Sequence, residues 1–554
     1  MPVINMPLDL LLRLVNADRS VIDESRVPQT LHDMGIELDE LTSTTAFTCR
    51  VCSNVMDRTE AQGEPLHCAK CGVEFRDRPD ALVKSGSHRV ARLDMLAVRP
   101  DIFDAGGMAR YMRGFLGIRT GLIDYPVLPA KLSVRVDPRL SRDASYRPAI
   151  ACAVLRNVRF DDERIKLLMN LQEDLHWALG RDRKLASIGV YDLDKVNAAG
   201  AAPFAYRAVG PDELRFVPLG YAEGDAGASM TPREVLQKHK TGRAYAHLLA
   251  KFSEYPLLTD ADGKVMSMPP IINSEATRVT LATRQCFVDV TGLAQRTVDR
   301  ALNILVAGLK EVMPELQIEG VKVEYERGPV VTPNFATTEM ALDASLASDT
   351  IGIQLSVGEL SGLLERMGHG VTANGAELRV RVPAWRNDIL HPIDLIEDAA
   401  VALGYEKLSP VILPAYAPGR PRALEERSAV ARRVMVGLGF HQVMTLVLLN
   451  EDAAFSRWNL PVDPCAVRIE HPISSEQTIA RVSLLPGLLH TLSINKQYEL
   501  PQRIFEVGDV SFADAGVETG AREQRRVAAA SMLLLASSSF FLVRASTSPN
   551  LPNA

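Results

Sequence analysis

The sequence predicts an α+β protein of several domains. Its 554 residues exceed the usual size of one domain, and 47% hydrophobic with 23% charged residues is typical of a globular chain. Apolar runs that suggest buried strands alternate with stretches of helical periodicity. The formal net charge of -6 provides no overall basic field, so any nucleic-acid contact must come from local clusters or from another subunit.

Cysteine usage predicts a reducing, cytoplasmic location. The chain has seven cysteines, an odd number, and three of them are isolated in the sequence. The N-terminus lacks the basic region and the apolar length of a signal peptide. The 17 uncharged residues between Arg526 and Arg544 just reach the lower length limit of a membrane span. Their serines, alanines and terminal position favour a buried or disordered tail, and we expect no membrane association.

The first region, residues 1–145, contains the clustered cysteines, in the pattern CRVC-x15-CAKC. Two such pairs can present four thiolates tetrahedrally to Zn²⁺, and a site with no open position holds the fold rather than doing chemistry. We therefore expect a zinc-ribbon-like insertion at 46–76, with unligated cysteines as the alternative. A helix is expected at 106–118. The predicted ligands are Cys49, Cys52, Cys68 and Cys71.

The second region, 146–327, is expected to be α+β. RPAIACAVLRNVRF suggests a buried strand, and DDERIKLLMNLQEDLHWALG suggests a helix after it. Thr231, Pro232 and Glu234 mark the start of another helix with a capping box. A long amphipathic helix is expected at 295–313, and GPVVTPNF, 328–335, is expected to be a linker.

A candidate polar pocket lies in this second region. In SMPPIINSE, which begins at Ser267, two prolines predict an extended, stiff backbone ahead of Asn273. In FVDVTG, Asp289 and Thr291 are two residues apart on an expected strand, so they share a face. These four side chains can line a small polar pocket in an apolar wall. Polar groups satisfied locally within a turn are the alternative.

A basic stretch after HWALG has two interpretations. Arg181, Arg183 and Lys184 are suited either to phosphate contact or to a solvated loop, and the sequence alone favours the loop.

The third region, 336–410, is compact and carries an acidic cluster. Ser356 and Glu359 form a capping box before a helix that ends at Gly368, and the strand ELRVRVP and a helix from Pro392 follow. Three of the acids fall at i, i+3 and i+4 on that last helix, and four carboxylates suit Mg²⁺. Acids that complement a helix dipole are the alternative. The cluster is Asp388, Asp394, Glu397 and Asp398.

The last region, 420–532, follows a linker at 413–423 and is expected to run from a helix into strands. Residues 533–554 form a divergent, uncharged tail. The chain contains no P-loop, Rossmann fingerprint or nucleophile elbow, so it has no visible nucleotide-chemistry motif.

In order along the chain, these motifs resemble the β subunit of phenylalanine-tRNA ligase, in its archaeal and eukaryotic form. The resemblance covers most of residues 85–530, and the CxxC pairs and the tail lie outside its pattern. It is carried by RPAIACAVLRNVRF, LQEDLHWALGRDRKLASIGVYDLDKV, FVPLG, MTPREVLQKH, PLLTDADGKVMSMPPIINSEATRV, VPAWRNDILHPIDLIEDAAVALGY and RVSLLPGLLHTLSINKQYELPQRIFEVGDV.

The resemblance implies an (αβ)2 heterotetramer that charges tRNA(Phe) with phenylalanine, using ATP and Mg²⁺. ATP and phenylalanine would bind the α subunit, where activation takes place. The β chain would carry an editing domain at 146–327 that hydrolyses mischarged tyrosyl-tRNA(Phe). It would also carry a small winged-helix-like α/β domain at 336–410 and an incomplete class II synthetase-like antiparallel domain at 420–532.

The resemblance also implies roles for individual residues. Asn273 and Asp289 would hydrogen-bond to the tyrosine hydroxyl or to other substrate groups, and no general base is assigned. Asp388, Asp394, Glu397 and Asp398 match the Mg²⁺ ligand pattern of the family. Two other functions stay open: a stand-alone trans-editing hydrolase and a non-enzymatic zinc-ribbon binding module. The implied editing pocket consists of Leu258, Ser267, Asn273, Asp289 and Thr291.

Overall fold

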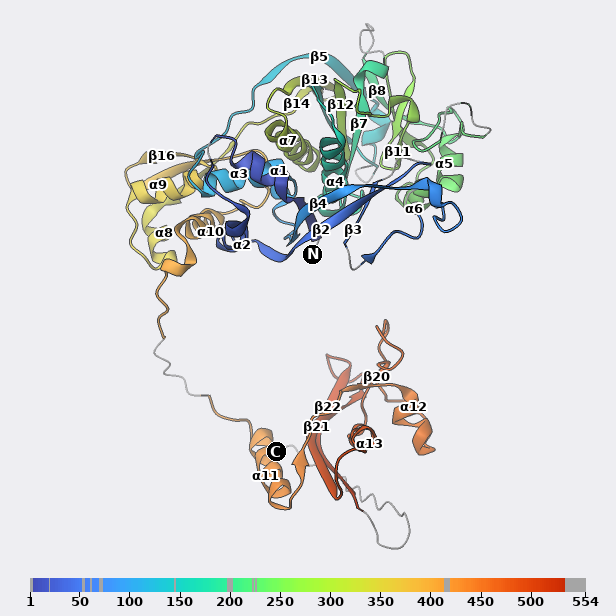
Figure 1. Cartoon of the computed structure of the whole chain (residues 1–554), viewed down its shortest axis with the longest axis vertical. Coiled ribbons are helices and arrows are strands. Elements are labelled where there is room, and N and C mark those ends of the chain that lie inside the picture. Colours follow the sequence, from blue (N-terminus) through green and yellow to red (C-terminus); the bar gives the residue numbers. More distant parts are fainter. Residues whose placement is uncertain are drawn as a thin grey trace. The chain divides into compact units, whose positions relative to one another are not determined.

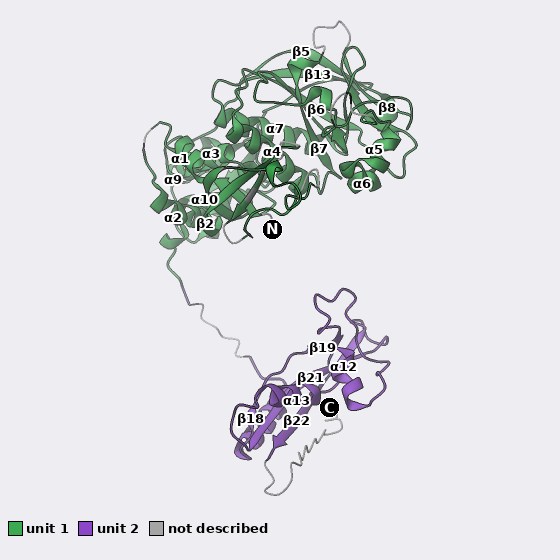
Figure 2. Cartoon of the chain, turned by 45° about the vertical axis from the view of Figure 1, so that its right-hand side comes forward, with its two compact units in different colours: residues 1–410 green, residues 411–554 purple. Residues whose placement is uncertain are grey.

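The computed structural model divides the chain into two compact units, residues 1–410 and 411–554 (Figure 2). Each unit has hydrophobic cores of its own, and both mix helices with strands, as the sequence predicts. The finer domain boundaries within these units stay predictions. The described residues are 3–18, 20–51, 55–59, 62–68, 73–143, 146–196, 203–221, 224, 227–412 and 419–533.

The N-terminal part of unit 1 is a four-stranded antiparallel sheet in the order β1-β4-β2-β3, with three helices. Its strands are β1 (Val3–Pro7), β2 (Glu37–Cys49), β3 (Val55–Thr59) and β4 (Leu82–Asp94). The helices are α1 (Leu8–Val15), α2 (Val27–Asp33) and α3 (Ala105–Phe115). Helix α3 confirms the prediction at 106–118, although it ends earlier; Asp104 caps it by accepting from the backbone N–H of Gly106 and Gly107.

A ten-stranded sheet forms the centre of unit 1 (Figure 1). Nine strands follow the order β11-β10-β9-β8-β5-β13-β6-β12-β7, and β14 pairs with β13. The strands are β5 (Val127–Val136), β6 (Ala149–Arg156), β7 (Ala186–Asp192), β8 (Phe204–Val209), β9 (Tyr255–Thr259), β10 (Val265–Met268), β11 (Ile272–Asn273), β12 (Cys286–Gly292), β13 (Gln317–Tyr325) and β14 (Gly328–Thr332).

The linker predicted at 328–335 is wrong for its first five residues, which form β14. Gly328 has a φ of 117°, which lets the chain reverse tightly after β13. Val330 and Val331 then pair with Val323 and Lys322 of β13. The two prolines of GPVVTPNF suggested a linker, but β-branched residues next to a free strand edge favour pairing.

The two faces of the ten-stranded sheet have different coverings. Helices α4 (Asp162–Ala178) and α7 (Gln295–Val312), both predicted, pack against β6, β7 and β12 in the largest core. The opposite face encloses a second core with four fully buried aromatic side chains. Beside it lie α5 (Pro232–Lys238), with the predicted capping box of Thr231 and Glu234, and α6 (Lys240–Tyr245). The four aromatic residues are Tyr191, Phe204, Tyr206 and Phe287.

The last part of unit 1 is a three-stranded sheet, in the order β15-β17-β16, with three helices. The predicted capping box of Ser356 and Glu359 starts α9, and Gly368 follows its end with a φ of 85°. The elements are β15 (Thr338–Asp343), α8 (Ala344–Ile351), α9 (Val357–Arg366), β16 (Gly370–Asn374), β17 (Glu377–Val382) and α10 (Pro392–Leu403).

Unit 2 runs from a helix into strands, as predicted. Its elements are α11 (Ala423–Gly437), β18 (His441–Gln442), β19 (Leu448–Leu449), α12 (Glu451–Ala454), β20 (Ile479–Ala480), α13 (Leu485–Ile494), β21 (Gln502–Ala513) and β22 (Ala521–Met532). The start of the uncharged stretch lies in β22, so those residues form a strand; the tail from 534 is outside the described residues. Among the described residues, no helix is both long and apolar enough to cross a membrane.

Candidate functional site

The stretch SMPPIINSE forms a tight hairpin, where the sequence predicted an extended strip. Strands β10 and β11 pair so that Ser267 lies opposite Asn273 and Met268 lies opposite Ile272. The two prolines therefore occupy the turn between the strands. Ser267 also pairs with Leu258 in β9. The hairpin thus gathers three of the five residues predicted for the editing pocket.

The two ends of the ten-stranded sheet meet at this hairpin. Strand β7 lies at one end of the strand order and β10 and β11 lie at the other. Tyr191 of β7 contacts Ser267 through a hydroxyl–hydroxyl hydrogen bond of 2.8 Å, and Asn273 Nδ2 donates to the Val190 carbonyl at 3.3 Å. We call this junction of β7 with the hairpin the seam. Side-chain hydrogen bonds hold it, whereas backbone ladders join the other neighbouring strands.

Side chains also satisfy the backbone of β7 on its open edge. Gln172 donates to the Ile188 carbonyl at 2.7 Å, and the Ile188 N–H donates to His176 Nε2 at 2.8 Å. Arg183, from the turn before β7, donates to the Ile271 carbonyl in the hairpin at 3.1 Å. An edge strand covered in this way presents no free template for pairing with another chain.

Asp289 lies at the buried centre of the seam. It sits on β12, paired with Gly189 of β7, and its carboxylate accepts a hydrogen bond from the Tyr191 hydroxyl. Burial raises the pKa of Asp289 to about 7, although the hydrogen bond from Tyr191 and the charge of Arg147 oppose the rise. Burial also raises the pKa of Tyr191 well above its ordinary value, so its phenol keeps the proton that it donates.

Gly189 provides the space for this contact. A Cβ atom added to Gly189 would lie 2.0 Å from Tyr191 Oη and 2.4 Å from Asp289 Oδ1. Both distances are far shorter than any non-bonded contact, so a larger residue at 189 would force the phenol and the carboxylate apart.

Thr291 belongs to an adjacent buried contact. Arg147 donates to Thr291 Oγ1 from Nε at 3.3 Å and to Ser187 Oγ at 2.9 Å. Burial lowers the pKa of Arg147 to about 10, although neighbouring Tyr206 and Asp289 raise it. The structure therefore brings Ser267, Asn273 and Asp289 together at the seam. It packs Thr291 against Arg147 on the same face of β12, and Leu258 in the core behind them.

Three residues of the site carry no signal in the sequence that marks them as functional: Tyr191, Gly189 and Arg147. Tyr191 ends the apolar run ASIGVY, where it is indistinguishable from a core aromatic residue. Gly189 and Arg147 each stand alone in the sequence, without the spacing that marks a site. Their roles depend on strands that meet only in the folded chain.

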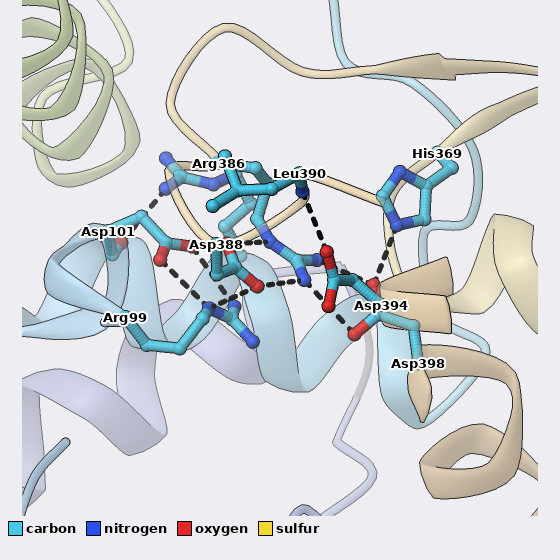
Figure 3. Close-up of polar contacts among 9 residues, drawn as sticks. Arg99, Asp101, His369, Arg386, Asp388, Leu390, Asp394 and Asp398 are labelled. Carbon is cyan, nitrogen blue, oxygen red and sulfur yellow. Dashed lines mark hydrogen bonds and ion pairs between the residues drawn. The ribbon is translucent and has the colours of Figure 1, made fainter. Parts of the chain in front are cut away.

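A second polar cluster surrounds Arg386, between the N-terminal part of unit 1 and α10 (Figure 3). Arg386 donates to Asp388 from Nε at 2.9 Å and from a terminal nitrogen at 2.6 Å. The same guanidinium donates to Asp398 at 3.0 Å. His369 Nε2 lies 2.7 Å from the other Asp398 oxygen, and Arg99 lies 3.9 Å from Asp388. We call these five residues the Arg386 cluster.

The charges of this cluster compensate one another. Burial would raise the pKa of Asp398, but Arg386 and the hydrogen bond from His369 hold it well below its ordinary value. Burial lowers the pKa of His369, more than Asp398 raises it, so the imidazole is neutral near pH 7. Burial would likewise raise the pKa of Asp388, which Arg386 keeps below its usual value. Arg386 is therefore the cation that Asp388 and Asp398 bind.

The other two predicted magnesium ligands point elsewhere. Asp394 accepts from the backbone N–H of Leu390 at 2.7 Å and of His391 at 2.8 Å, which caps the start of α10. Glu397 is exposed. Within the described part of the chain, no group of three or more His, Cys, Asp or Glu side chains is arranged to hold a metal ion.

This arrangement does not fit Mg²⁺. A magnesium ion needs carboxylate oxygens free to face it, together with waters. Arg386 occupies the space between Asp388 and Asp398, and the adjacent cavity, of about 20 Å³, holds no more than a water molecule. Five arginines also line that cavity: Arg99, Arg110, Arg119, Arg366 and Arg386.

Two of the four clustered cysteines lie within the described residues. Cys49 ends β2, and the Cys68 N–H donates to the Val73 carbonyl at 2.9 Å. Both are buried in one small core with Phe75 and Ala81. Cys52 and Cys71 lie outside the described residues, so the four-thiolate zinc site stays a prediction.

Two family models match the C-terminal half of the chain. The family model described as the tRNA synthetase B5 domain matches residues 340–405, and that of the phenylalanyl-tRNA synthetase beta chain CLM domain matches 410–539. The chain is thus an aminoacyl-tRNA synthetase subunit. It is 31% identical to an N-terminal fragment of the phenylalanyl-tRNA synthetase β subunit of Pyrococcus horikoshii, whose structure matches 73% of this chain and all of that fragment with a TM-score of 0.60.

Relatives that match about three quarters of the chain show its family. The phenylalanine-tRNA ligase β subunit of Methanothrix thermoacetophila is 44% identical over 413 residues, 74% of each chain. That of Methanosarcina barkeri is 43% identical over 74% of this chain and 73% of its own, and that of Methanococcus maripaludis strain C7 is 36% identical over 80% and 77%. The chain belongs to the phenylalanine-tRNA ligase β subunit family.

Proposed function

We propose that this chain acts in the cytoplasm as the scaffolding and editing subunit of a phenylalanine-tRNA ligase. An α subunit activates phenylalanine with ATP and Mg²⁺, and the two chains charge tRNA(Phe) as an (αβ)2 heterotetramer. Two findings support this proposal: membership of the β subunit family, and a sequence without a nucleotide-binding motif of its own. The family match also disfavours a free-standing editing enzyme or a zinc-ribbon binding module.

Editing serves a physical need. Phenylalanine and tyrosine differ by one hydroxyl, and an apolar pocket rejects an added hydroxyl by a factor of only about 10². A second site that hydrogen-bonds this hydroxyl can select the tyrosyl ester for hydrolysis, because phenylalanine would leave its buried polar groups unpaired.

The seam supports this role through one observation: Asp289 and Ser267 already hold a phenol hydroxyl, that of Tyr191. A carboxylate and a hydroxyl in an apolar, buried setting suit the recognition of a tyrosyl side chain. We propose that Asp289 and Ser267 bind the substrate hydroxyl, that Asn273 orients the hairpin or the ester, and that Leu258 and Thr291 complete the wall. The residue that activates water is not assigned.

The test uses the ligase reconstituted with an α subunit and tRNA(Phe) charged with tyrosine or phenylalanine. Asp289→Ala and Asn273→Ala are expected to slow tyrosyl-tRNA hydrolysis by about 10²-fold or more and to leave phenylalanine charging intact. Asp349→Asn, which changes an exposed acid on α8, serves as the matched control. Unchanged hydrolysis of tyrosyl-tRNA in both alanine variants would refute the editing role of the seam.

We further propose a structural zinc ion bound by Cys49, Cys52, Cys68 and Cys71. Support comes from the spacing of the CxxC pairs and from the small core shared by Cys49 and Cys68.

Magnesium use by the ligase is proposed from the family resemblance alone. Binding of Mg²⁺ at Asp388, Asp394, Glu397 and Asp398 would require Arg386 to leave two of these carboxylates.

A further inference from the structure

A tyrosine side chain of the protein itself fills the seam. Tyr191, Asp289 and Ser267 are 0%, 1% and 2% exposed, so their hydrogen bonds are closed to solvent. The Tyr191 hydroxyl donates to Asp289 and contacts Ser267, and its ring packs beside Phe287 with the centroids 6.0 Å apart. The side chain thus makes the contacts expected of a bound tyrosyl group.

Removal of this side chain would leave a space of matching size and chemistry. The space would have the volume of a tyrosine side chain, with Leu258 in its apolar wall and Asp289 and Ser267 at its polar end. While the side chain is in place, a substrate has no access to Asp289.

The position of Tyr191 allows it to move out. Among the described residues, strand β7 has a backbone ladder only with β12. On the seam side, the side chains of Tyr191 and Asn273, with Arg183 from the preceding turn, join it to the hairpin. Opening the seam beside Tyr191 therefore breaks a few side-chain hydrogen bonds and no strand pairing. Local opening of this kind occurs on the microsecond-to-second timescale.

We propose that Tyr191 is an internal surrogate for the substrate: its phenol occupies the tyrosyl-recognition site in the resting protein and is exchanged for the tyrosyl group of a mischarged tRNA. This inference rests on the proposed editing function and adds a gating step to it. One phenol replaces another, so Asp289 and Ser267 are hydrogen-bonded before and after the exchange.

The exchange protects correctly charged tRNA. A phenylalanyl group would displace the Tyr191 hydroxyl without replacing its hydrogen bonds, leaving a buried carboxylate unpaired. The surrogate also competes with every ligand equally and lowers the apparent affinity for both esters. The selectivity between the two esters therefore comes from the hydrogen bonds to Asp289 and Ser267, and the surrogate lowers the background hydrolysis of phenylalanyl-tRNA.

The sharpest test is Tyr191→Phe in the full chain, with non-hydrolysable 3′-aminoacylamino-adenosine analogues as probes. The variant keeps the ring but loses the hydrogen bonds of the resting state, which destabilises only that state. We expect about tenfold tighter binding of both the tyrosyl and the phenylalanyl analogue, with their affinity ratio unchanged. The reconstituted ligase carrying the variant should also hydrolyse phenylalanyl-tRNA about tenfold faster.

Tyr146→Phe is the matched control. Tyr146 is buried in the same core, and its hydroxyl has no hydrogen-bond partner among the described residues, so binding should be unchanged. Weaker binding of the tyrosyl analogue by Tyr191→Phe would show that Tyr191 is a fixed part of the binding site. That result would contradict the proposal that substrate displaces its side chain. A crystal structure of the complex with Tyr191 still bonded to Asp289 would do the same. Tyrosyl binding by neither wild type nor variant would refute the editing function itself, and with it this inference.

Discussion

Arg386 binds Asp398 with two nitrogens of one guanidinium, at 2.9 and 3.0 Å, although both side chains are buried. A buried ion pair gains little net stability over an apolar contact of the same shape, but removal of one partner leaves an uncompensated charge. The pair also lies where three segments of unit 1 meet: the loop with Arg99, the turn between α9 and β16 with His369, and α10. It therefore governs how α10 is fixed to the rest of unit 1.

Replacement of Arg386 should destabilise the protein strongly. Arg386→Met removes the cation but keeps much of the side-chain volume, so the buried Asp398 and the partly buried Asp388 remain as neighbouring acids. We expect the free energy of unfolding to fall by about 3–5 kcal/mol, measured by chemical denaturation. Arg379→Met, which changes an exposed arginine on β17, should alter it by less than about 0.5 kcal/mol. Similar small effects for both variants would show that the Arg386 cluster does not fix α10 to the rest of unit 1.

Magnesium should not stabilise the isolated chain through the Arg386 cluster. Any ligand that binds the folded state raises its melting temperature, and Arg386 already neutralises two of the predicted ligand carboxylates. We expect added Mg²⁺, or its removal with a chelator, to shift the midpoint by less than about 1 °C. A rise of several degrees that Asp388→Asn abolishes would instead restore the magnesium site predicted from the sequence.

Zinc, in contrast, should copurify with the chain. Four thiolates at the spacing of the two CxxC pairs should hold about one Zn²⁺ per chain, measured by elemental analysis. Cys49→Ser and Cys68→Ser are each expected to remove the metal and to loosen the small core with Phe75. Cys465→Ser, which changes an exposed cysteine in unit 2, is the matched control and should leave the zinc content unchanged. Absence of zinc from the wild-type protein would end the proposal.

Asp289 should make stability depend on pH. Its pKa is about 7 in the folded chain and near 3.8 when exposed, so between these values the folded state binds one more proton than the unfolded state. The free energy of unfolding should therefore fall as pH rises from about 4 to about 7, by up to about 4 kcal/mol, and then level off. Asp289→Asn does not titrate, so a denaturation series in which wild type and variant have the same pH slope would contradict this assignment.

The sequence predicted local features better than contacts between distant segments. The capping boxes at Thr231 and Ser356 were confirmed, because a cap depends on residues three positions apart. The seam was only half predicted: Ser267, Asn273 and Asp289 were expected to meet, but Tyr191 was not. Tyr191 lies 98 residues before Asp289, which the pairing of β7 with β12 brings beside it. It lies 76 residues before Ser267, which belongs to the opposite end of the strand order.

For the acidic cluster, the sequence predicted the residues but not the groups that they contact. Spacing on α10 predicted that three acids share one face. In the structure Asp394 caps the helix, Glu397 is exposed and Asp398 is buried beside Arg386. Spacing also carries no information on what neutralises the acids. Arg386 lies two residues before Asp388 in the sequence, and only the folded loop turns its guanidinium between Asp388 and Asp398. A pattern of like charges is thus ambiguous between a metal site and an ion-pair cluster until the opposite charges are placed.

Gly189 offers a test of the seam that leaves every polar group in place. In Gly189→Ala the new methyl group would overlap Tyr191 Oη and Asp289 Oδ1, so the phenol must leave the carboxylate. Overpacking of this kind typically lowers the free energy of unfolding by about 1–3 kcal/mol. The matched control is Gly358→Ala, in helix α9, where an added Cβ meets nothing within 4 Å and alanine favours the helix. Chemical denaturation of both variants measures their free energies of unfolding. Equal values would mean that the seam accommodates a methyl group at residue 189. The close contact between Tyr191 and Asp289 would then be wrong.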